Sequence, residues 1–246
     1  MKRILFASLA SGAALVATAA HAQDEDSTGV YIGVDVGVAS AGDTNITYYD
    51  AGGTFGGTGT TDSASGKVAL DSALGVAGVV GYDFGMVRAD VEVAYSRNKI
   101  SGLTISSVNG APVTLASADV DEICDYLEVS GCSGSGNTIS YDGGRVRQLS
   151  AMANLWLDIP LRGAVTPYVG GGVGVNGFET DGEGTGKFAW QLGAGVALKI
   201  SPAISLTANY RHREASDAAI EWDANSGFTL GKLKTDTFSA GLRFTL

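Results

Sequence analysis

Residues 29–40 read GVYIGVDVGVAS, and this stretch decides the fold. Every second residue is aliphatic, and a period of two predicts a β-strand with one apolar face. The two faces differ in kind: one carries Val30, Ile32, Val34, Val36 and Val38, and the other carries Tyr31, Gly33, Asp35 and Gly37. An aliphatic face suits contact with lipid, while small and polar residues suit the narrow interior of a small barrel.

Seven further segments alternate in the same way. They are residues 70–84, 87–97, 149–159, 165–175, 188–199, 204–213 and 237–246. Short turns at 84–86, 160–163 and 201–203 alternate with long polar loops at 41–68, 98–148, 177–187 and 214–234. Loops sorted by length onto two sides are typical of a transmembrane barrel, and a soluble β-sandwich has no reason to sort them. We therefore predict an all-β fold: an eight-stranded antiparallel transmembrane β-barrel with long extracellular loops and short periplasmic turns.

The N-terminus has the features of a secretory signal. Lys2 and Arg3 precede an apolar stretch, and residues 20–22 form an A-x-A cleavage site. We expect residues 1–22 to be a cleaved signal peptide, 23–28 a short periplasmic tail, and 29–246 the barrel. Such a chain belongs in the outer membrane of a Gram-negative bacterium.

Composition narrows the function classes. The formal net charge is −10, and removal of Lys2 and Arg3 with the signal leaves −12. Nucleic acid is therefore not an expected partner, because phosphate binding needs a basic surface. After the signal, no stretch approaches the roughly 18–20 apolar residues of a transmembrane helix. The 36 glycines follow no period of three, which excludes a collagen-like chain.

The long loop insert at about 98–148 has features of its own. Short apolar stretches at 103–108 and 113–116 flank a turn signal and predict a hairpin, too short to span a membrane. Residues 118–128 have helical spacing. The only two cysteines, Cys124 and Cys132, lie at this helix and just after it. In an exported protein such a pair predicts a disulfide.

Several stretches resemble a known family. They are MANLWLDIP at 152–160, TPYVGGGVG at 166–174, KFAWQLGAGV at 187–196 and ISPAISL at 200–206. They resemble the small outer-membrane β-barrel domain family, especially its alphaproteobacterial major-surface-antigen or opacity-type branch. The likeness is good over 149–213 and at the C-terminus and poor in the loops, and the family's usual terminal Phe is Leu246 here. It implies an eight-stranded barrel inserted by the outer-membrane assembly machinery. Members are antigens, adhesins, structural proteins or minor pores, so no single activity is implied.

Charged residues fall on the face that should line the lumen, and strand order suggests how they pair. The third and seventh strands oppose each other across an eight-stranded barrel, so Glu92 can approach Arg211. The first and eighth strands are neighbours at closure, so Asp35 can approach Arg243. The alternative is that some of these charges line the rims in water. The predicted lumen ionic network comprises Asp35, Arg88, Asp90, Glu92, Arg211, Arg213 and Arg243.

Other candidate sites are weak. The glycine run at 170–174 lacks the following Lys-Ser/Thr and helix of a phosphate loop, so a strand is favoured. His212 is the only histidine of the mature chain, and alternation points it outward between two arginines. A catalytic histidine should face the lumen or a groove near a serine. The acidic loops contain no complete calcium loop. We expect no catalytic residue, cofactor or metal site.

We therefore expect a barrel with a structural or surface-interaction role, antigen-like or adhesin-like, carried by the extracellular loops. The first alternative is a small diffusion pore, and a less favoured one is a lipid-modifying enzyme. Expected partners are outer-membrane lipid and lipopolysaccharide. The acidic loop residues are expected to form a solvated face, and bridging to lipopolysaccharide by divalent ions is the less favoured alternative. A host or surface ligand could bind the loops.

Overall fold

A computed structural model describes residues 28–52, 61–127, 130–142, 144–161, 163–180, 183–221 and 224–246. The expected signal peptide at 1–22, and all but the last residue of the expected tail at 23–28, lie outside the described residues. Within the described part, no helix has the length and apolar character needed to cross a bilayer.

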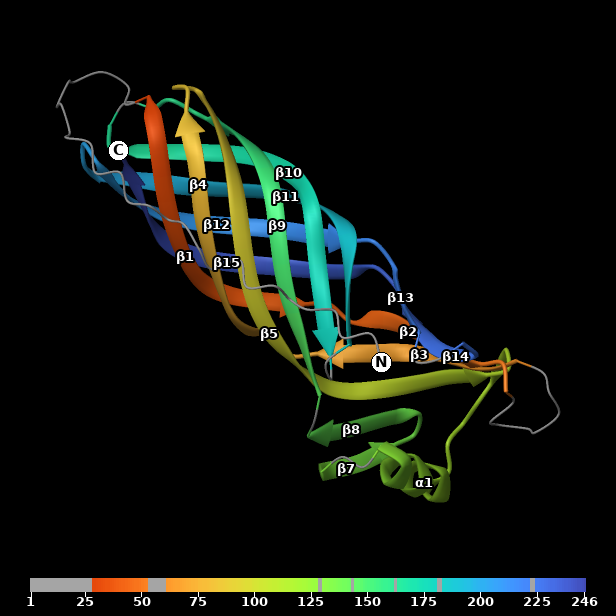
Figure 1. Ribbon diagram of the computed structural model, residues 1–246. Coiled ribbons are helices and arrows are strands. Elements are labelled where there is room, and N and C mark those ends of the chain that lie inside the picture. Colours follow the sequence, from red (N-terminus) through yellow and green to blue (C-terminus); the bar gives the residue numbers. More distant parts are fainter. Residues whose placement is uncertain are drawn as a thin grey trace.

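Eight long strands form a closed antiparallel ring, as predicted. Around the ring the order is β1-β4-β5-β9-β10-β11-β12-β15, and β15 pairs with β1 to close it. Figure 1 shows this ring as the main part of the molecule. The C-terminus lies at the end of the ring that is farther from α1. The strand bounds are Gly29–Ala41 (β1), Ala73–Asp83 (β4), Val87–Val108 (β5), Arg145–Asp158 (β9), Val165–Thr180 (β10), Glu183–Ser201 (β11), Ile204–Ala215 (β12) and Leu233–Thr245 (β15).

Exposure shows which face of the ring points outward. The aliphatic residues are outside: Val34 and Val80 are both 58% exposed. The polar residues are inside: Glu92 and Gln191 are both 1% exposed. A soluble barrel has the opposite arrangement, so the outer wall is built for contact with lipid.

A second sheet continues the barrel beyond the membrane. β5 has 22 residues, about twice the roughly 9–11 that a spanning strand needs. On one side, the second half of β5 pairs with β3, and the sheet continues in the order β3-β2-β14-β13. On its other side it pairs with β8, which in turn pairs with β7. These strands are Thr44–Asp50 (β2), Asp62–Leu70 (β3), Ala111–Pro112 (β6), Ser130–Ser135 (β7), Thr138–Asp142 (β8), Ala218–Glu221 (β13) and Ser226–Leu230 (β14). We call them, with the second half of β5, the extracellular sheet.

The extracellular sheet corrects several sequence predictions. The stretches 41–68, 98–148 and 214–234, expected as loops, contain these strands. Leu70 ends β3, and the second spanning strand starts at Ala73. The physical reason is that β5 leaves the membrane with unpaired backbone groups on both edges. Neighbouring chain segments satisfy these groups by pairing with it.

The insert carries α1, which spans Ser117–Leu127 and agrees with the helix expected at 118–128. The predicted hairpin is only partly formed. Its turn is present, with positive φ at Asn109 and Gly110, but only the two residues of β6 pair with β5, and 113–116 lie outside any strand. A disulfide joins Cys124 of α1 to Cys132 of β7. Figure 1 shows α1, β7 and β8 set to one side of the barrel.

We predict that the disulfide stabilises the insert and not the barrel. It closes a short loop of sequence separation 8, which limits its contribution to about 2–3 kcal/mol. Replacing both cysteines by serine should leave the eight-stranded ring folded and inserted. Protease added to intact cells should then cut residues 119–136 faster than in the wild type. Loss of the heat-modifiable folded band on a gel would contradict this placement.

Candidate functional site

The barrel interior is filled by layers of side chains, and the layer nearest the short turns is an ion pair between aromatic rings. Arg88 Nη2 lies 2.8 Å from Asp158 Oδ1, and Arg88 Nε also donates to both carboxylate oxygens. The Arg88 guanidinium lies 5.7 Å from the Tyr31 ring and 4.7 Å from the Tyr168 ring. Side chains from four strands, β1, β5, β9 and β10, therefore contact one another at this end of the lumen.

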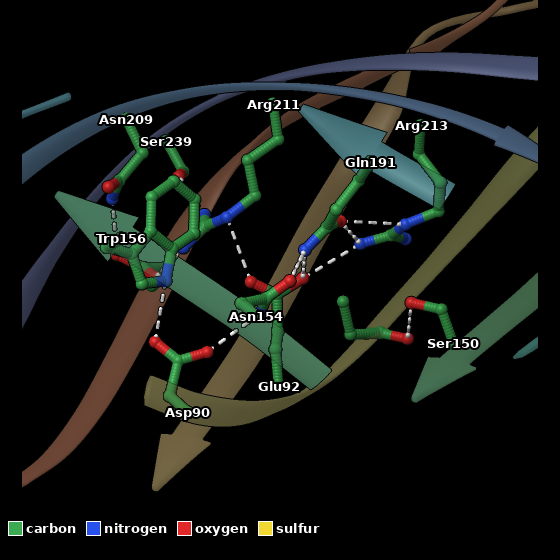
Figure 2. A network of polar contacts seen from close by, with 12 residues as sticks. Asp90, Glu92, Ser150, Asn154, Trp156, Gln191, Asn209, Arg211, Arg213 and Ser239 are labelled. Atoms are coloured by element: carbon green, nitrogen blue, oxygen red, sulfur yellow. Dashed lines mark hydrogen bonds and ion pairs between the residues drawn. The ribbon is translucent and has the colours of Figure 1, made fainter. Parts of the chain in front are cut away.

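Glu92 is the centre of the middle layer. Its Oε1 accepts from Arg213 Nη2 at 2.8 Å, and its Oε2 lies 2.9 Å from Arg211 Nε, an ion pair without good hydrogen-bond geometry. Arg213 also donates to Gln191 Oε1, at 2.9 Å from Nη2. Figure 2 shows one carboxylate held between two arginines from the opposite wall. Glu92 and Arg211 thus meet across the barrel.

Asp90 lies beside this layer and is surrounded by neutral donors. Its carboxylate accepts from Tyr31 Oη at 2.7 Å, Trp156 Nε1 at 2.8 Å and Asn154 Nδ2 at 2.8 Å. Two of these contacts are visible in Figure 2. These three donors provide hydrogen bonds to both oxygens of the buried carboxylate. Asp90 therefore links β1, β5 and β9 without an arginine partner of its own.

Asp35 has a different partner from the one that strand order suggested. It accepts from Arg211 Nη2 at 3.3 Å and from Asn209 Nδ2 at 2.9 Å. The predicted approach of Asp35 to Arg243 is wrong. The β1–β15 register sets Asp35 opposite Gly241, two residues away from Arg243 along the strand.

Arg243 lies instead at the end of the lumen near the short turns. Its guanidinium is 5.7 Å from the Tyr31 ring, and its buried Nη1 has no hydrogen-bond partner among the described residues. A cavity of about 230 Å³ opens below it, between the turns. Of the seven predicted network residues, six make ion pairs or hydrogen bonds in the lumen and Arg243 stays apart from their carboxylates.

Above Glu92, three amide side chains and one threonine form a hydrogen-bonded layer in the lumen. Gln148 Nε2 donates to Asn98 Oδ1 at 3.1 Å, and Gln148 Oε1 accepts from Asn176 Nδ2 at 3.2 Å and from Thr235 Oγ1 at 3.3 Å. All four side chains are buried. We call these four residues the amide layer.

Glycines make room for the aromatic side chains of the lumen. A Cβ on Gly81 would stand 2.6 Å from Tyr31 Cζ, and one on Gly195 would stand 2.6 Å from Tyr168 Cζ. Both distances are shorter than real carbon contacts. The high glycine content therefore has a packing reason at these positions: the tyrosine rings lie directly on bare backbone.

His212 lies on the outer wall, as its place in the alternation predicts. Its Nδ1 is 2.8 Å from Asp236 Oδ1, and its ring centroid is 5.7 Å from that of Trp190. Asp236 also accepts from Tyr210 Oη at 2.7 Å. In the described ranges, no group of three or more His, Cys, Asp or Glu side chains is placed to hold a metal ion.

Several lumen residues lie outside the predicted ionic network, among them Asp158, Trp156, Gln191 and Asn209. The period of two predicts that Asp158, Gln191 and Asn209 lie on the polar face, but the predicted network contains only seven other charged residues. Trp156 is assigned to neither face. Its even number beside Asn154 and Asp158 was the signal that could have located it inside.

The family model of the outer membrane protein beta-barrel domain matches residues 9–245, nearly the whole chain. The chain belongs to the outer membrane protein beta-barrel domain family. The protein is accordingly an outer-membrane protein, and its ring of eight strands is the family's barrel.

Individual relatives of this barrel protein are distant. An uncharacterized protein of Brucella abortus (strain 2308) is 27% identical over 157 residues, covering 54% of this chain and 48% of its own. A Brucella melitensis protein, also uncharacterized, is 28% identical over 156 residues with the same coverage. The chain thus matches about half the length of these curated relatives.

Solved outer-membrane structures are similar at low identity. The match to Neisserial surface protein A has a TM-score of 0.48 and 18% identity, and covers 88% of this chain and 97% of that one. The match to the outer membrane protein OprG from Pseudomonas aeruginosa has a TM-score of 0.49 and 14% identity, and covers 89% of this chain and 98% of that one.

Proposed function

We propose that this protein is a closed outer-membrane barrel that displays its extracellular sheet for interactions at the cell surface. The observation that carries the proposal is the filled lumen. The Arg88–Asp158 pair, the Glu92 cluster and the amide layer follow one another along the barrel. An eight-stranded barrel is only just wide enough for its own side chains, so each layer blocks the passage.

The remaining space in the lumen supports a closed state. The cavity beside Glu92 and the one beside Asp90 each have a volume of about 30 Å³. That is room for about one water molecule. Arg211, Glu92 and Asp35 hold one another through ion pairs in this region, so widening the path requires breaking buried pairs. A diffusion pore is the less favoured role for this reason.

The extracellular sheet supports the surface role. It is built on the continuation of β5, and the disulfide ties α1 to it. Lys99 of β5 also donates to Asp142 of β8, and this contact holds the pKa of the Asp142 carboxyl below its usual range. An ordered surface loses less conformational entropy on binding than flexible loops lose. We propose that this sheet contacts lipopolysaccharide at its base and a surface or host ligand above.

We also propose a non-catalytic role. His212 pairs with Asp236 on the outer wall and does not reach the lumen network. A lipid-modifying enzyme would use a histidine beside a nucleophile. A lipid A esterase assay on the wild type and on His212→Ala tests this proposal. Wild-type activity that is lost in His212→Ala would favour an enzyme.

Conductance tests the closed lumen. Purified wild-type protein in a planar bilayer should show little steady conductance, because each lumen layer is closed by side chains. The periplasmic cavity below Arg243 does not change this expectation, since the Arg88–Asp158 pair lies above it. A large, permanently open conductance would contradict the proposal and favour a pore.

Adherence tests the surface role. We expect a variant in which a Gly-Ser linker replaces residues 113–142 to insert normally, because these residues contribute no strand to the ring. Cells displaying it should adhere less than wild-type cells to an epithelial monolayer. Unchanged adherence together with increased leakage of large antibiotics would favour a purely structural role. Unchanged behaviour in both assays would contradict a role for the insert.

A further inference from the structure

The interior changes from polar to apolar above the amide layer. On β9, β10 and β15, the next inward positions after Gln148, Asn176 and Thr235 are Val146, Phe178 and Leu233. Phe178 is 5% exposed and Leu233 is 7% exposed, and both belong to one hydrophobic cluster. The extracellular mouth of the barrel therefore has an apolar lining on a polar floor.

The extracellular sheet lies over this mouth, and a partly open cavity of about 260 Å³ lies between its strands and the mouth. Its walls come from Ile46 of β2, Val68 of β3, Leu103 of β5 and Leu230 of β14, together with the three residues of the mouth. We call this cavity the apolar chamber. None of the described residues that line it is charged.

The apolar chamber has little to hold water. Its lining includes three residues with a side-chain hydroxyl, Thr44, Tyr48 and Tyr141, and the hydroxyl of Thr44 donates to Gly231 O at 3.0 Å. Buried water needs two to four polar partners, and the other lining residues, mostly aliphatic, have no polar side-chain atom to offer. A dry cavity of about 150 Å³ is already large enough to bind benzene. The chamber, at about 260 Å³, has room for a molecule of two fused rings or a short hydrocarbon chain.

We propose that the apolar chamber is a binding site for a small uncharged apolar molecule, of the class of one- or two-ring hydrocarbons. Binding fills a void and restores contacts that the lining side chains lack. Charged molecules are excluded, because the chamber offers them no partner. The site goes beyond the proposed surface role and does not depend on it. Its ligand enters from outside and stops at the amide layer.

Naphthalene is a suitable probe, with the full-length mature barrel in lipid nanodiscs and methyl NMR as the measurement. Methyl groups of Ile46, Ile100 and Leu230 should shift in a saturable way as naphthalene is added. The lipid-facing methyl groups of Val34 and Val80 report partition into the bilayer, and should drift without saturation. Chamber methyl groups that only drift like the lipid-facing ones would overturn the proposal.

Two tryptophan variants separate the site from the lipid. Leu230→Trp fills the chamber and should weaken the saturable response by about tenfold or more. Leu74→Trp places the same bulk on the lipid face, where Leu74 is 69% exposed, and should leave the response unchanged. If Leu230→Trp does not fold, Ile46→Phe takes its place. A folded chamber variant that binds naphthalene as the wild type does would show that the chamber is not the site.

Discussion

Replacing Glu92 with alanine is expected to lower the free energy of unfolding by about 3–5 kcal/mol. The change leaves Arg211 and Arg213 buried without their shared carboxylate, and both are held by Glu92 across the lumen. Arg211 retains Asp35 and Arg213 retains Gln191, which limits the loss to a few kcal/mol. Urea titration of the barrel refolded in lipid vesicles, followed by heat-modifiable gel migration, measures the change.

A double variant tests whether the loss comes from stranded charge. Glu92→Ala with Arg211→Ala should recover part of the stability lost in the single variant, because one stranded cation is removed. Recovery should be incomplete, because Arg213 is still left without Glu92. Glu92→Gln keeps the shape and some hydrogen bonds and should lose less than alanine. Equal stability of wild type and Glu92→Ala would mean that water reaches this layer and pairs with the arginines.

Replacing Arg88 with leucine is expected to have an effect of similar size, about 3–5 kcal/mol, at the end of the lumen near the short turns. Asp158 then loses both arms of the guanidinium fork. The rings of Tyr31 and Tyr168 lose their cation as well. The same urea titration measures the change, and an unchanged midpoint would contradict a buried pair here.

Two comparisons define the origin of this effect. Arg88→Leu with Asp158→Leu removes both charges and should regain much of the loss, since an apolar pair of similar volume can replace a buried ion pair. Arg88→Lys keeps the charge but lacks the planar fork that matches a carboxylate, so it should be intermediate. A double variant as unstable as the single one would place the stabilisation in the ring contacts and not in the ion pair.

The direction of each spanning side chain could be predicted from sequence, because a strand alternates with a period of two whatever its neighbours are. The outward place of Val34 and the inward place of Glu92 follow from this rule. The ion-pair partner of each lumen charge could be predicted less reliably than its direction. Glu92 pairs with Arg211, but the β1–β15 register sets Arg243 two residues away from the position opposite Asp35. A difference of two residues in register is enough to change an ion-pair partner. Register is a property of two paired strands and is not visible in either one.

The sequence by itself determined the class of fold: eight-stranded, apolar outside and polar inside, because hydrophobic periodicity and loop lengths depend only on local order along the chain. The tertiary structure alone decided three things. It set which charges pair in the lumen, it placed strands of an extracellular sheet within expected loops such as 41–68, and it formed the apolar chamber above the amide layer. Each of these depends on contacts between segments far apart in sequence. Ile46 and Leu230, for example, pair across 184 positions only because β2 and β14 meet in one sheet.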